Sequence, residues 1–121
     1  MLIMIGEPLS MNYKQWIGKT ELESKIMNSN EPKIAVFAAK WCGFCKRFME
    51  LVTKYKSSGS ISQLSIIDTD SDDGSLWEKY RIDIVPTIIV FKGGKEVFRQ
   101  GGRSMQGLNQ KDLEDAIKAA T

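Results

Sequence analysis

Short continuous apolar runs alternate along the chain with segments whose apolar residues recur at helical spacing. The runs at residues 34–39, 64–67 and 88–91 are long enough for buried strands. A further strand is predicted at residues 96–99, because a Gly-Gly pair between two strand-like runs is typical of a hairpin. The pattern therefore predicts two strands followed by a hairpin.

Helical spacing predicts three helices between and after these strands. The longest begins after Trp41, and its apolar face consists of Cys45, Phe48, Val52 and Tyr55. A short helix is predicted at residues 76–80, with Asp72 or Asp73 as its cap. The last helix carries Leu113, Ile117 and Ala120 on one face. Asn109 followed by Asp112 resembles the cap that begins it.

Residues 1–19 have the least regular pattern. Residues 1–5 are compatible with an edge strand, and a helix is predicted to begin on Tyr13, Trp16 and Ile17. Thr20 and Glu23 form a capping box, and the apolar residues that follow at helical spacing are Leu22, Ile26 and Met27. A helix that ends before Pro32 is therefore predicted here.

These elements predict an α/β fold with a mixed central β-sheet and helices on both faces. A strand, a helix and a parallel strand are joined by a right-handed crossover, and the hairpin extends the same sheet antiparallel. A length of 121 residues suits one compact domain, so residues 1–121 are expected to form a single domain. Residues 1–19 are then an extension, an edge strand or a helix.

Charge and composition exclude several classes of function. The formal net charge is only +2, whereas nucleic-acid and membrane-surface proteins need a concentrated basic field. The chain has no histidine, which excludes Ser/His and Cys/His nucleophilic sites and imidazole-bound zinc. No signal-peptide pattern or membrane-spanning apolar stretch is present, so we expect a cytoplasmic protein.

The two cysteines form a Cys-x-x-Cys motif where a buried strand leads into a helix. Backbone N–H groups at a helix start carry partial positive charge and favour a thiolate, so Cys42, on an exposed turn, is the predicted attacking thiol. Cys45 lies one turn inward and is predicted to be more buried and more protonated. Lys40 and Lys46 are candidates for further stabilisation of the thiolate. Such a pair can form and resolve a mixed disulfide.

The cysteines have two other possible interpretations, and a nearby acidic segment has one. Inert core cysteines would not require a position between a strand and a helix beside a tryptophan. A structural zinc site usually needs four ligands, and this chain supplies two thiols and no imidazole. A calcium loop at residues 68–79 fails because Asp73 and Lys79 hold the positions that need Gly and Glu. We therefore predict a redox site without a metal or cofactor.

The sequence resembles the thioredoxin family. The resemblance rests on residues 41–46, on Val85-Pro86-Thr87, on residues 91–94 and on Gly102, and it covers roughly residues 33–120. It implies a thioredoxin-like fold in which a cis Val85–Pro86 bond lies beside the sulfurs. It also implies a docking surface for disulfide-bearing chains, made by Trp41, Gly43, Phe44, Val85, Pro86 and Gly102.

By the same resemblance, the chain is a protein-disulfide reductase and electron carrier that is recharged by a flavin-dependent thioredoxin reductase. We expect a monomer without nucleic-acid or membrane partners. Two alternatives stay open: a disulfide oxidase or isomerase, and a non-catalytic thioredoxin-like binding module or metal-bridged dimer.

Three positions depart from the family pattern. Val36 replaces the usual buried Asp that is thought to take the proton of the resolving thiol, and Leu64 is the nearest match to the lysine that accompanies it. Phe44 replaces the proline between the cysteines, and Glu50 replaces a proline further along the helix. The family's proton relay and redox potential therefore do not carry over directly.

Overall fold

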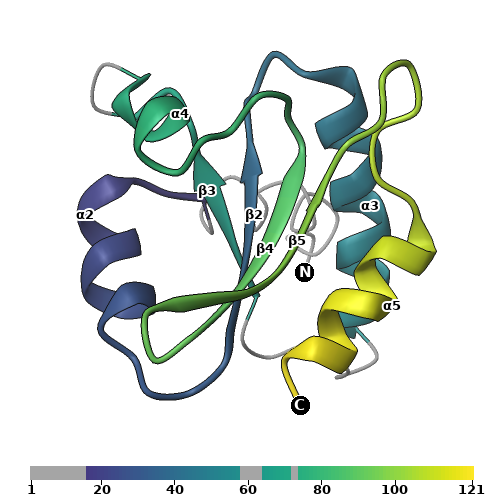
Figure 1. The fold of residues 1–121 in the computed structure, drawn as a ribbon. Coiled ribbons are helices and arrows are strands. Elements are labelled where there is room, and N and C mark those ends of the chain that lie inside the picture. The colour runs from purple at the N-terminus through teal and green to yellow at the C-terminus, as the bar shows by residue number, and fades with distance from the viewer. Residues whose placement is uncertain (1–15, 58–63, 72–73) are drawn as a thin grey trace, which may run out of the picture.

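The described strands form one five-stranded sheet in the order β1-β3-β2-β4-β5 (Figure 1). The computed structural model describes residues 16–57, 64–71 and 74–121. The strands are β1 (Trp16–Ile17), β2 (Lys33–Ala38), β3 (Leu64–Asp68), β4 (Thr87–Lys92) and β5 (Lys95–Gly101). This confirms the four strands predicted from the apolar runs.

The central strand β2 sets the register of the sheet. It runs parallel to β3 and antiparallel to β4, and β5 is antiparallel to β4. Val36 pairs with Ile66 on one side and with Ile88 on the other. A strand with helices over both faces buries nearly all of its side chains, which explains its continuous apolar sequence.

Helices cover both faces of the sheet, as predicted. They are α2 (Lys19–Glu21), which continues as the π-helix η1 (Leu22–Met27), α3 (Gly43–Ser57), α4 (Ser75–Lys79) and α5 (Gln110–Ala119). Figure 1 shows α2 and α4 on one side of the sheet and α3 and α5 on the other. None of the helices in the described ranges is long and apolar enough to cross a membrane.

The N-terminal predictions were partly wrong. Trp16 and Ile17 do not begin a helix but form β1, which pairs with β3 at Ile66 and Ile67. The predicted capping box at Thr20 is not formed, because the helix already begins at Lys19 and its N-cap is Gly18. The predicted edge strand at residues 1–5 lies outside the described residues.

Helix caps differ between the two shorter C-terminal helices. At α4 the N-cap position is held by Gly74, and the predicted capping residues Asp72 and Asp73 lie outside the described residues. At α5 the prediction is confirmed. Asn109 and Asp112 form a reciprocal capping box, in which each side chain accepts a hydrogen bond from the backbone N–H of the other.

Candidate functional site

The Cys-x-x-Cys motif spans the turn between β2 and α3. Cys42 precedes the first residue of α3, and the backbone N–H of Cys45 donates a hydrogen bond of 3.1 Å to Cys42 Sγ. The N–H of Lys46 in turn donates to the Cys42 carbonyl at 3.2 Å. Cys42 therefore occupies the position of a helix N-cap, where its sulfur accepts from an otherwise unpaired N–H group.

The two thiols differ in burial less than predicted. Cys42 is 6% exposed and Cys45 is fully buried. The expectation that Cys42 is exposed was wrong, because the residue is buried and only lines a groove. The prediction that Cys45 is the more buried of the two thiols is nevertheless confirmed, and of the pair only Cys42 lines the groove.

Cys45 is held in its protonated form by its surroundings. Burial in the apolar core is the main influence that raises the pKa of its thiol, and the hydrogen bond with Cys42 raises it further. A hydrogen bond with the backbone of Ala39 acts in the opposite direction but is outweighed. The second thiol therefore resists ionisation while it stays in this environment.

In the described strands, the residues that pair with Val36 supply no carboxylate in place of the missing acid. Val36 is fully buried, and the residues that pair with it on the neighbouring strands are Ile66 and Ile88. Leu64, the nearest match to the family's lysine, is also apolar and buried, and it pairs with Ile34. Within the described ranges the one buried carboxylate is that of Asp112 on α5, which is already paired with Arg103.

The segment before β4 lies against the sulfur of Cys42. The Val85–Pro86 peptide bond is cis, as the resemblance implied. The Val85 carbonyl accepts a hydrogen bond from the Cys42 thiol at 3.6 Å, and Gly102 donates its N–H to the Pro86 carbonyl at 2.9 Å. A Cβ atom at Gly102 would approach that carbonyl oxygen to 2.8 Å, so a side chain there would require the backbone to shift.

The residues that flank Cys42 are fixed by contacts of different kinds. Trp41 is 67% exposed, and its indole Nε1 donates to the Asp70 carboxylate at 2.9 Å. Phe44 lies under Arg47, whose guanidinium carbon is 5.3 Å from the ring centre. The ammonium of Lys40 lies 4.0 Å from Asp68 and above the ring of Trp16.

The groove that contains Cys42, which we call the dithiol groove, has three walls. They are residues 41–44, residues 83–85 with Trp77, and residues 103–105 with Gly107. Five of the predicted site residues line it: Trp41, Cys42, Gly43, Phe44 and Val85. Cys45, Pro86 and Gly102 are not among its lining residues. Cys45 is hydrogen-bonded to Cys42, and Gly102 to Pro86.

Residues 103–107 were missed in the sequence. They form a polar, glycine-containing connection between the last strand and the last helix, and nothing in their pattern marks them as part of a site. Only the long-range return of this segment to the start of α3 brings them to Cys42.

Comparison with known proteins settles the family. The thioredoxin family model matches residues 14–119, which is most of the chain. The chain belongs to the thioredoxin family. Thioredoxins are thiol–disulfide oxidoreductases, and the chain is accordingly a protein-disulfide reductase.

Individual thioredoxins show how far the similarity extends. Thioredoxin-2 of Saccharomyces cerevisiae is 29% identical over 91 residues, which cover 75% of this chain and 86% of the yeast protein. A bifunctional thioredoxin reductase/thioredoxin of Mycobacterium leprae is 29% identical over 93 residues, or 76% of this chain and 20% of that protein. The structure of Plasmodium falciparum thioredoxin superposes with a TM-score of 0.69 at 26% identity, covering 88% of this chain and 99% of that one.

Proposed function

We propose that this thioredoxin reduces protein disulfides through Cys42 as the attacking sulfur and Cys45 as the resolving sulfur. The observation that carries the proposal is the asymmetry of the pair. Cys42 accepts a hydrogen bond from the Cys45 N–H and lines the dithiol groove, whereas Cys45 is fully buried behind it. An incoming disulfide therefore meets Cys42 first.

The proposed reaction has two exchange steps. The Cys42 thiolate attacks one sulfur of the substrate disulfide, forms a mixed disulfide and releases the other substrate sulfur as a thiolate. Cys45 then attacks Cys42, the mixed disulfide breaks, and the second substrate sulfur leaves with the proton that Cys45 gives up. The first substrate thiolate takes a proton from solvent, which received one when Cys42 ionised. The substrate thus gains two electrons and two protons overall, and Cys42 and Cys45 form an intramolecular disulfide.

Substrate docking is proposed for the surface around the groove. By family resemblance it comprises Trp41, Gly43, Phe44, Val85, Pro86 and Gly102. The exposed indole of Trp41 and the backbone that carries the cis bond flank Cys42, which supports this assignment. An extended chain that pairs with this backbone would be recognised without strong dependence on its sequence.

The dithiol must be regenerated after each cycle. We propose a flavin-dependent thioredoxin reductase as the electron donor, and the Mycobacterium leprae relative, in which reductase and thioredoxin are one chain, supports such a partnership. We also propose a cytoplasmic location, because a reductase of this type works where thiols are kept reduced.

The serine variants of the two cysteines test the roles. We expect Cys42→Ser to abolish insulin reduction and to trap no substrate, because the attacking sulfur is gone. Cys45→Ser should accumulate a mixed disulfide with substrate, seen on a gel as an adduct that disappears with dithiothreitol. Equal trapping by both variants would contradict the assignment of roles, and absence of turnover in the wild type would contradict the proposed activity itself.

A further inference from the structure

The segment Arg103–Gly107, which we call the β5–α5 loop, is a tightly closed turn. The N–H groups of Gln106 and Gly107 donate to the Arg103 carbonyl at 2.9 and 2.8 Å, and the Arg103 N–H donates to the Gly107 carbonyl at 3.0 Å. Gly107 has a φ of +71°, which a glycine adopts without strain. The backbone of the loop is thus closed on itself.

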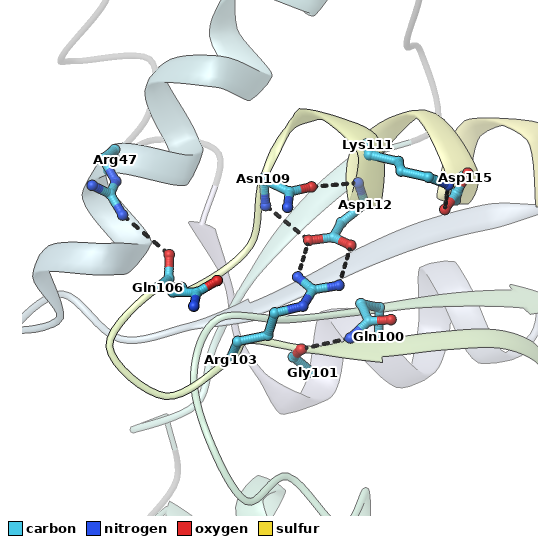
Figure 2. A network of polar contacts seen from close by, with 9 residues as sticks. All are labelled: Arg47, Gln100, Gly101, Arg103, Gln106, Asn109, Lys111, Asp112 and Asp115. Atoms are coloured by element: carbon cyan, nitrogen blue, oxygen red, sulfur yellow. Dashed lines mark hydrogen bonds and ion pairs between the residues drawn. The ribbon is translucent and has the colours of Figure 1, made fainter.

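Side chains from two helices hold this loop in place (Figure 2). The Arg103 guanidinium forms a two-pronged ion pair with Asp112 of α5, at 2.7 and 3.0 Å. Arg47 of α3 donates to the Gln106 carbonyl at 3.1 Å from the other side. The loop is therefore fixed both to α5 and to the helix that begins with the Cys-x-x-Cys motif.

The loop also contacts the motif directly. A Cβ atom at Gly107 would lie 3.0 Å from Cβ of Phe44, so glycine is required for the loop to pack this closely on the residue between the two cysteines. Arg103, Ser104 and Met105 line the dithiol groove together with Cys42. The loop is thus a fixed wall of the site and not a separate surface feature.

Met105 at the tip of the loop is 83% exposed, in a left-handed conformation with a φ of 64°. In the described part of the chain, three large apolar side chains are exposed: Trp41, Val97 and Met105. Two of them, Trp41 and Met105, line the dithiol groove, and Val97 lies on the edge strand β5 outside it. Exposed apolar area is therefore concentrated at the mouth of the groove.

We propose that the β5–α5 loop is a specificity element that selects disulfide-bearing segments with a large apolar side chain beside the cystine. The inference rests on the proposed reductase function, since the occupant is the substrate itself. The occupant is an extended client segment, because the apolar surface is continuous with the groove that holds Cys42. The charge of Arg103 is neutralised by Asp112, which leaves the Met105 side chain as the main feature that this wall presents. A flexible thioether can adapt to apolar side chains of different shape.

Two matched peptides test this inference. Each carries one cysteine in a mixed disulfide with glutathione, and the residues on both sides of the cysteine are Leu in one peptide and Ser in the other. The rate constant for reduction by the pre-reduced protein is measured under single-turnover conditions. We expect the wild type to prefer the Leu peptide roughly tenfold.

Met105→Asn should reduce this preference to about twofold or less. Asparagine tolerates the left-handed conformation of residue 105, so the loop backbone is kept while the apolar side chain is lost. Val97→Thr is the control, because it removes exposed apolar area outside the groove and should retain the full preference. Met105→Gly repeats the test without any side chain, should the Asn variant fail to fold.

The outcomes separate the inference from the proposed function. If the wild type reduces neither peptide, the proposed function is wrong. If it reduces both at equal rates, or if Met105→Asn keeps the preference, the loop is not a specificity element although the function stands. If Met105→Asn leaves the preference intact but converts a dimer into a monomer in sedimentation, the occupant is a second copy of the chain and the inference is overturned.

Discussion

The fate of one proton depends on the surroundings of Cys45. In the proposed reaction its thiol must ionise, or lose its proton during attack, before the mixed disulfide can be resolved. Burial raises the pKa of this thiol, and Val36, Ile66 and Ile88 offer no group that accepts a proton. The departing substrate thiolate is then the nearest base that the reaction itself provides. Resolution is therefore expected to depend on the basicity of the substrate sulfur.

A carboxylate at position 36 should change this step. We expect Val36→Asp to accelerate resolution near neutral pH, because a buried carboxyl has a raised pKa and gains the ability to accept the proton of Cys45 as it ionises. The rate should then rise with pH through the titration of the new group. The measurement is stopped-flow release of a coloured thiol from a mixed disulfide on Cys42.

The matched control for this variant is Val36→Asn, which has the same shape but does not titrate. Both variants bury a polar group in an apolar strand, so both should lose stability, on the order of 2–3 kcal/mol. A pH profile that is the same in Val36→Asp, Val36→Asn and the wild type would show that an acid at this position has no part in resolution.

The start of α5 combines a helix cap with an ion pair. Burial alone would raise the pKa of Asp112, but the hydrogen bonds from Arg103 and from the Asn109 N–H outweigh it and hold the pKa below its usual range. The same carboxylate thus binds Arg103, the first residue of the β5–α5 loop, and caps the helix. The cap at Asn109 and Asp112 therefore also fixes Arg103, which lines the dithiol groove.

Asp112→Asn should lower the free energy of unfolding at pH 7 by about 1–3 kcal/mol, because hydrogen bonds to a charged group are lost. The folded-state pKa of Asp112 is depressed below its unfolded value of about 3.9, so this stabilisation is present above that value. It is lost as the pH falls through the folded-state pKa. Urea unfolding of wild type and variant at pH 7 and pH 3 should therefore show a difference that shrinks in acid.

Asp115→Asn serves as the control for this prediction. Asp115 pairs with Lys111 one turn along the exposed side of α5, and such surface pairs contribute little. A loss of stability as large as that of Asp112→Asn, or a loss for Asp112→Asn that persists unchanged at pH 3, would contradict the role given to the buried carboxylate.

At the scale of the whole molecule, local sequence patterns predicted the helices and strands better than the long-range contacts between them. The strands at residues 34–39 and 88–91, the helix after Trp41 and the cap at Asn109 were all predicted, since each depends on residues close in sequence. The short strand β1 was not predicted. Two residues are too few to show a periodic pattern, and this strand forms by pairing with β3.

The candidate site shows the same division between local and long-range information. Cys42, Phe44 and Val85 were predicted from motifs, and the structure brings them to one groove. The pairing of Val36 with Ile66 and Ile88 was not predicted, because strand register is decided by packing across the sheet. Met105 was missed because its place beside Cys42 results from the return of a distant loop.

The direction of electron flow is a property of the folded protein as a unit. A strong oxidant is one whose reduced form is stabilised, and burial disfavours a thiolate at Cys45. We therefore expect a reduction potential at or below the cytosolic glutathione poise of about −220 to −260 mV, measured by titration against glutathione. A potential above about −180 mV would favour the oxidase or isomerase alternative instead. Cys45→Ser, which cannot form the internal disulfide, is the control.

The burial of Cys42 restricts which disulfides can approach its sulfur. Cys42 is 6% exposed and lines the groove. Its sulfur can therefore be approached in line only by a cystine that projects from its own chain. Cross-links lying flush with a rigid, well-packed surface cannot enter, whereas those on protruding loops or loosened segments can. The burial that shields Cys42 from bulk solvent thus leaves the disulfides of intact proteins unreduced. Reduction is directed toward disulfide bonds that have become accessible.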